Sequence, residues 1–155
     1  MLWAELDLGR ELWRLPAERT KNHKPHDVPL PRQAVDVLSA QRKEGETTHV
    51  FGRHDRGFAT WDRCKADLDR TVSISSWVVH DLRRTAITGM AEIGIQPHVI
   101  EAIVNHTSGH KAGVAGVYNR AEYAAEKRAA LKRWADHLNR IVAGAHSDNV
   151  VEFGR

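Results

Sequence analysis

Apolar and polar positions change their spacing along the chain, and the N-terminal part has the spacing of short strands. Residues 12–15 are largely apolar, residues 28–30 are apolar again, and Asn22 and Pro25 interrupt the polar stretch between them. Two short apolar runs separated by turn-forming residues predict a β-hairpin, with its tip at residues 20–26.

Helical spacing of the apolar residues follows over most of the remaining chain. The predicted helices cover residues 32–45, 59–72, 81–94, 96–106 and 122–142. The last has the strongest pattern, because its apolar residues recur at spacings of three, four and three: Leu131, Trp134, Leu138 and Ile141. We therefore expect an α+β fold, mostly α-helical, with a small antiparallel sheet near the N-terminus.

Three other segments lack helical spacing. Residues 48–58 predict a short buried strand or turn, and glycines interrupt residues 110–120. Residues 143–155 are small and polar, so we expect a flexible tail there. Residues 1–142 would then form one domain.

Composition narrows the class of protein. The chain has 155 residues, 41% of them hydrophobic and 28% charged, which fits one globular domain with a modest core. No apolar run approaches the roughly 20 residues needed to cross a membrane, and the N-terminus lacks a signal pattern. The single cysteine, Cys64, excludes an internal disulfide and favours the cytoplasm. Cys64 follows Trp61 at helical spacing, so we expect it to be inert core.

Charge and histidine content permit two kinds of site. The net charge of +3 is compatible with nucleic-acid binding without requiring it. Ten histidines raise the question of a metal, and His106 and His110 are four residues apart. Glycine lies between them and no acidic partner accompanies them, so we expect no metal site.

Five residues at four places carry possible chemistry: Lys21 at the hairpin tip, His80 with Arg83, His106, and Tyr118. His80 and Arg83 would share one face of a helix, about 4.5 Å apart along its axis. A helix start favours phosphate, and arginine matches phosphate oxygens with two parallel hydrogen bonds. Each residue alone also has a plain structural explanation: a solvated turn lysine, a helix-start or helix-end histidine, a packed tyrosine.

Taken in order, these motifs resemble the catalytic domain of tyrosine recombinases of the phage-integrase type. The resemblance rests on "HDLRRT" at residues 80–85, "VNH" at 104–106 and "VYNR" at 117–120, preceded by the hairpin lysine. It extends over nearly the whole chain, from "LWAELDL" at residues 2–8 to the final helix. Tyr123 lies at the start of that helix, where packing is the simpler explanation.

The resemblance implies DNA strand cleavage with no metal, ATP or other cofactor. Tyr118 would be the nucleophile and form a 3′-phosphotyrosyl link. Reaching a phenolate at pH 7 costs about 4 kcal/mol, which nearby positive charge and a base must offset. Arg83 and His106 would bind the phosphate, His80 would assist proton transfer at the phenol, and Lys21 would protonate the 5′-oxygen.

The resemblance also implies partners. Double-stranded DNA would contact Lys24, and Arg84 and Thr85 would either touch its backbone or remain surface residues. In family members the last helix often docks on a neighbouring protomer, so a homo-oligomer on DNA through the C-terminal helix is expected. No membrane partner is expected.

The chain departs from the family's pattern at its start. The family's first catalytic arginine lies upstream of the segment that "LWAELDL" matches, whereas Arg10 and Arg14 follow it. We therefore expect an N-terminally truncated catalytic domain; a late gene start, a decayed prophage remnant and a deliberately cut chain all remain open. Two alternative functions also remain: an inactive DNA-binding remnant without that arginine, and an interaction module.

Overall fold

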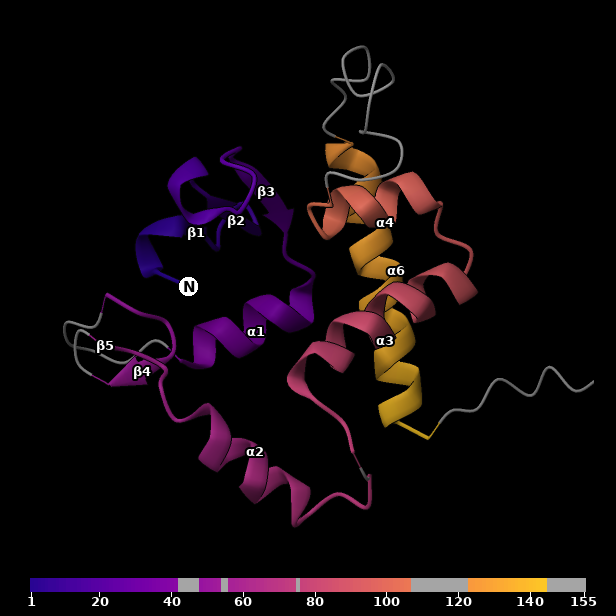
Figure 1. Ribbon diagram of the computed structural model, residues 1–155. Helices are drawn as coiled ribbons and strands as arrows, with labels where there is room; N and C mark the ends of the chain where they lie inside the picture. Colours follow the sequence, from indigo (N-terminus) through magenta and orange to yellow (C-terminus); the bar gives the residue numbers. More distant parts are fainter. Residues whose placement is uncertain (42–47, 54–55, 75, 107–122, 145–155) are drawn as a thin grey trace, which may run out of the picture.

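The computed structural model describes residues 1–41, 48–53, 56–74, 76–106 and 123–144 (Figure 1). Its helices are α1 (Arg32–Ala40), α2 (Trp61–Asp69), α3 (Val79–Glu92), α4 (Pro97–Ile103) and α6 (Ala124–Val142). A small antiparallel sheet precedes them, so the expected α+β class is confirmed. Helix α1 ends earlier than predicted, and the expected tail lies outside the described residues from 145 onward.

The N-terminal sheet contains the predicted hairpin. Strands β2 (Leu12–Leu15) and β3 (His26–Pro29) pair antiparallel, with Trp13 opposite Val28. Strand β1 (Leu6–Asp7) pairs with the other edge of β2, and it was not predicted because two residues are too few for an alternating pattern. The hairpin tip follows a short 3₁₀ helix, η2 (Ala17–Arg19).

The described part of residues 48–58 contains a second, smaller sheet. Strands β4 (Gly52–Arg53) and β5 (Arg56–Gly57) pair antiparallel. Val50, just before them, is buried, whereas the neighbouring Phe51 is exposed. The expectation of a short strand or turn is therefore confirmed, but only part of the segment is buried.

Two hydrophobic clusters stabilise the fold. The first joins α3, α4 and α6, with Met90, Val99, Ile100 and Ala130 buried at its centre. Gly89 lets α6 approach α3, because a Cβ there would lie only 2.5 Å from the Trp134 ring. The second cluster joins the sheet region to α1 and is built from Leu30, Val35, Leu38 and Val50.

Helix α2 forms where predicted, but its apolar residues remain exposed. The helix lies apart from the other helices in Figure 1, and Trp61 and Leu68 are 57% and 45% exposed. Cys64 is exposed as well, so its expected place in the core was wrong. Apolar spacing predicted the helix correctly, but spacing alone does not ensure that another element covers the apolar face.

Helix α6 is held to the sheet by a buried cation that apolar spacing did not indicate. Lys127 is only 5% exposed, and its Nζ donates a hydrogen bond of 2.7 Å to the backbone oxygen of Asp27 in β3. The next residue, Arg128, donates to the Glu11 carboxylate and to the Arg10 carbonyl, both at 3.3 Å. These bonds fix the hairpin base against the helical part of the chain.

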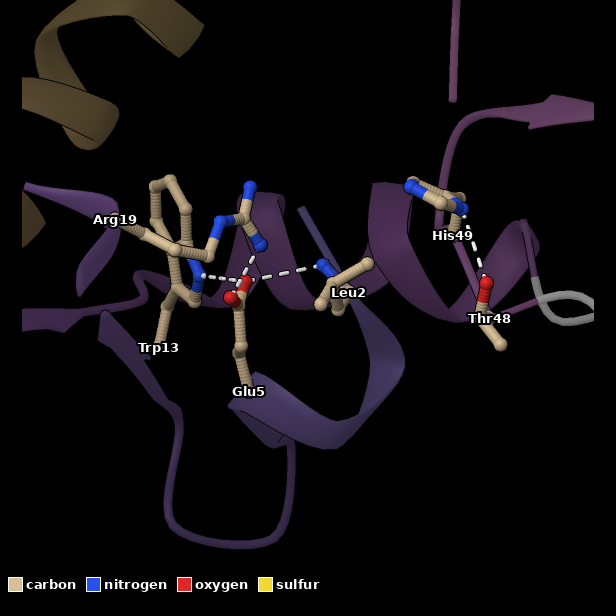
Figure 2. Close-up of polar contacts among 6 residues, drawn as sticks. All are labelled: Leu2, Glu5, Trp13, Arg19, Thr48 and His49. Carbon is tan, nitrogen blue, oxygen red and sulfur yellow. Dashed lines mark hydrogen bonds and ion pairs between the residues drawn. The ribbon is translucent and has the colours of Figure 1, made fainter. Parts of the chain in front are cut away.

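A buried carboxylate organises the N-terminal region. Glu5, at the end of η1 (Trp3–Glu5), is 8% exposed. Figure 2 shows it accepting hydrogen bonds from Leu2 N at 3.0 Å and Trp13 Nε1 at 3.1 Å, and pairing with the Arg19 guanidinium. Burial raises the pKa of this carboxyl, but the donors outweigh that effect and hold the pKa below its ordinary value.

Replacing Glu5 with glutamine should destabilise the fold in a pH-dependent way. Near pH 7 we expect Glu5→Gln to lower the free energy of unfolding by about 1.5–3 kcal/mol, since charged hydrogen bonds are lost. Because the pKa of Glu5 is lowered in the folded state, the difference in unfolding free energy between Glu5→Gln and wild type is largest above about pH 5. It shrinks as the pH falls through the folded pKa. Urea unfolding from pH 3 to 8 measures it, with exposed Glu18→Gln as control. A pH-independent difference would contradict this role.

Candidate functional site

The hairpin tip is a closed turn that leaves the side chain of Lys21 exposed to solvent. Thr20 is buried, and its Oγ1 lies 3.0 Å from the Ala17 oxygen and 2.8 Å from the Lys24 oxygen. Thr20 Oγ1 also accepts a hydrogen bond from Lys24 N at 3.1 Å. His23 adopts a left-handed backbone conformation, with φ of 52°. Lys21 therefore has an ordered backbone and an exposed side chain.

Helix α4 ends in a second tight turn that directs His106 outward. Asn105 has φ of 55°, a left-handed conformation that asparagine adopts more readily than most residues. His106 N then donates 3.0 Å to the Glu101 oxygen, and the His106 side chain is exposed. The helix was predicted to extend to His106, but it ends at Ile103, and Asn105 is the residue that turns the chain.

These two turns contact each other directly. Asn22 Nδ2 donates 2.9 Å to Asn105 Oδ1, although the residues are 83 positions apart in the sequence. Nearby, His26 Nε2 lies 3.0 Å from the Ile103 oxygen, which ties β3 to the end of α4 (Figure 1). Lys21 and His106 are each one residue away in sequence from the Asn22–Asn105 bond, so the structure brings the backbones of these two predicted site residues near each other.

Helix α3 brings Arg83 to the same place. The helix start is organised by Asp81, whose Oδ2 accepts 2.9 Å from Val78 N. One turn into the helix, the half-buried Arg83 donates 2.6 Å through Nη2 to the Val104 oxygen. Lys21, Arg83 and His106 thus lie on or beside residues that contact the end of α4, as a shared ligand would require.

His80 occupies a less connected position. It lies in the first turn of α3 and is exposed. Among the described residues, no recorded hydrogen bond joins it to the end of α4. The helix start places His80 and Arg83 on one face as predicted, but only Arg83 makes the contact.

The predicted DNA-contacting residues are all at the surface. Arg84 is paired with Asp81 at 3.2 Å, with 72% of its side chain exposed. Such exposed pairs contribute little, so a phosphate can compete for the guanidinium. Thr85 and Lys24 are also exposed. The side chains of Arg84, Thr85 and Lys24 can therefore contact the backbone of a polyanion.

The two tyrosines differ in what the structure describes. Tyr118, the predicted nucleophile, lies outside the described residues, as does His110. Tyr123 precedes α6, and its ring lies 5.1 Å from the His98 ring, in line with the packing expected for it.

The described residues contain neither a metal-binding cluster nor a membrane-spanning helix. No group of three or more histidine, cysteine, aspartate or glutamate residues there is placed to hold a metal ion. Among the helices that the structure describes, none combines the length and apolar character that a membrane span requires.

Patterns in the sequence did not identify the residues that join the site. Asn22 is predicted only as a turn former, and no prediction assigns a contact to Asn105 or His26. An asparagine directly after a helical pattern is a signal for a left-handed turn, and this signal could have identified Asn105. The partner of that residue could not be found from local sequence.

Comparison with known proteins gives one consistent result. The sequence profile of the phage integrase family matches residues 1–124. The chain is 31% identical to prophage integrase IntA of Escherichia coli K12 over 152 residues, covering 96% of this chain and 35% of that protein. It is 36% identical to prophage integrase IntZ of the same bacterium over 146 residues, covering 92% and 35%.

A phage relative agrees, and the coverage is again partial. The integrase of Enterobacteria phage P4 is 26% identical over 155 residues, covering 88% of this chain and 35% of that protein. The chain therefore spans about 35% of the length of these relatives. No solved structure matches the chain significantly.

Neighbouring arginines on α3 should differ in their effect on stability. Arg83→Ala removes the charged donor from the Val104 carbonyl, and we expect the free energy of unfolding to fall by about 1.5–3 kcal/mol. Arg84→Ala removes only an exposed ion pair and should change it by less than about 0.5 kcal/mol. Urea unfolding followed by circular dichroism compares them. Equal losses would show that the Arg83 contact contributes nothing specific.

Proposed function

The chain belongs to the phage integrase family, and we propose that it carries the DNA-cleavage centre of a site-specific recombinase. In this proposal the centre breaks and rejoins DNA strands through a 3′-phosphotyrosyl intermediate. Because the chain spans only part of its relatives, the activity of the isolated chain is part of the proposal.

One observation supports this function above all others. Three predicted phosphate-binding or proton-donating residues gather where α4 ends: Lys21 beside the Asn22–Asn105 bond, His106 on its other side, and Arg83 on the Val104 carbonyl. These side chains come from the hairpin, α4 and α3. A single phosphate group is a ligand that donors from these three elements can share.

The chemistry assigns each residue one role. The Tyr118 oxygen attacks phosphorus and the bond to the 5′-oxygen breaks, so energy is conserved in the new ester. His80 accepts the phenol proton, and Lys21 gives a proton to the departing oxygen. Arg83 and His106 stabilise the negative charge that develops on the other phosphate oxygens. A 5′-hydroxyl of another strand reverses the step.

Duplex binding uses the exposed polar and charged residues around the site. Lys24 lies on the same turn as Lys21, and Arg84 and Thr85 follow Arg83 on α3. Contacts from these exposed residues to backbone phosphates position the duplex without reading its sequence. Affinity that falls steeply with salt is the expected consequence.

We also propose that the C-terminal end of α6 binds a second copy of the chain on DNA. The inner face of α6 is occupied within the chain, where Ala130 and Ala135 are buried. Leu138, Ile141 and Val142 are 40%, 54% and 86% exposed and remain available for a second copy.

The alternative function is duplex binding without cleavage. It draws on the same exposed cations and needs neither a nucleophile nor the family's first catalytic arginine. The two functions differ in whether a covalent product forms.

The decisive experiment compares two conservative tyrosine variants. Duplexes from the DNA flanking the gene, nicked so that the released strand diffuses away, are incubated with wild type, Tyr118→Phe and Tyr123→Phe. We expect a covalent adduct on a denaturing gel from wild type and Tyr123→Phe, and none from Tyr118→Phe, which lacks the attacking oxygen.

Two results would overturn the assignment. An adduct that persists in Tyr118→Phe would exclude this tyrosine as nucleophile. Salt-sensitive duplex binding with no adduct from any variant would favour the alternative function, binding without cleavage.

A further inference from the structure

We propose that the Asn22–Asn105 side-chain pair is a positioning device that holds Lys21 in place relative to His106 before DNA binds. This inference rests on the proposed function for the role of Lys21, but the contact itself does not. Asn22 Nδ2 lies 2.9 Å from Asn105 Oδ1. Lys21 directly precedes Asn22 in the sequence, and His106 directly follows Asn105.

Asn105 satisfies two requirements at once. Its φ of 55° is a conformation that glycine would adopt at lower cost. Glycine, however, has no side chain to accept the hydrogen bond from Asn22. Asparagine turns the chain toward His106 and provides that acceptor, so the turn and the contact with the hairpin are built by one residue.

The hairpin side of the contact immobilises the backbone of Lys21. On one side of the lysine, Thr20 is buried and bonded across the turn to Lys24. On the other side, Asn22 is bonded to Asn105. Lys21 therefore lies between two anchored residues, while its exposed side chain remains free to reach a ligand.

Other contacts hold strand β3 independently of the turn at residues 20–24. His26 Nε2 lies 3.0 Å from the Ile103 oxygen, and Lys127 Nζ lies 2.7 Å from the Asp27 oxygen. Loss of the Asn22–Asn105 bond should therefore leave the sheet docked and free only the tip. Small displacements of a catalytic group reduce rates strongly, so the tip is where precise placement matters.

The first test measures the tip in the absence of DNA. Amide hydrogen exchange at His23, whose N–H donates to the Thr20 oxygen at 3.3 Å, is compared in wild type, Asn105→Gly, Asn22→Ala and the double variant. Asn105→Gly keeps the left-handed turn and removes only the side chain, so we expect about 5-fold faster exchange, the size of one net hydrogen bond. The double variant should exchange no faster than Asn22→Ala alone.

A surface variant provides the control. Asn139→Ala removes an exposed asparagine on α6 and should leave exchange at the tip unchanged. If Asn105→Gly also leaves it unchanged, or if the two substitutions add, the positioning device is excluded.

The second test asks whether positioning acts through the lysine. Nicked duplexes carry either an ordinary phosphodiester or one in which sulfur replaces the 5′-bridging oxygen, because a thiolate leaves without being protonated. We expect Asn105→Gly to slow cleavage of the ordinary duplex about 5-fold and to leave cleavage of the sulfur duplex nearly unchanged. Equal slowing of both would exclude a role in placing Lys21.

The two tests separate failure of this inference from failure of the proposed function. If wild type forms no adduct with either duplex, the cleavage function fails for this chain. The exchange experiment still decides whether the asparagine pair holds the tip, since it uses neither DNA nor catalysis.

Discussion

The end of helix α4 is the point on which the arrangement of the site depends. The last carbonyls of a helix have no partner within it and must find donors elsewhere. Here His26 of β3 contacts the Ile103 oxygen, and Arg83 of α3 donates to the Val104 oxygen. Asn105 then adds a side-chain acceptor for the hairpin tip. Elements far apart in the sequence are thereby fixed around one short turn, with Lys21 and His106 beside it.

Exposed side chains on an anchored backbone are what a phosphate site requires. Burying Lys21 or His106 would cost solvation and block the ligand, whereas leaving their backbone loose would cost ordering when the ligand binds. Thr20 and Asn105 allow this combination because each closes a turn with a contact of its own. Membership of the phage integrase family explains why DNA phosphate is the ligand proposed.

The sequence predicted local features well and distant contacts poorly. Turn residues between apolar runs predicted the β2–β3 hairpin, and three- and four-residue spacing predicted α3, α4 and α6. The same spacing misplaced Cys64 in the core, because a helix pattern does not reveal whether another element covers it. The buried Lys127 was missed since lysine usually marks a solvated face. The motif order suggested that Lys21, Arg83 and His106 share a ligand, but not the Asn22–Asn105 bond that joins their turns.

The most direct test of a shared phosphate site is an NMR titration with a short duplex. The signals to follow are the Lys21 ammonium, the Arg83 guanidinium and the His106 ring, in side-chain-labelled protein. We expect all three to move together with one dissociation constant, since in the proposed function they bind one phosphate. If Lys24 and Arg84 move while Arg83 and His106 stay unchanged, DNA binds only at the surface and the end of α4 is a structural junction rather than a catalytic centre.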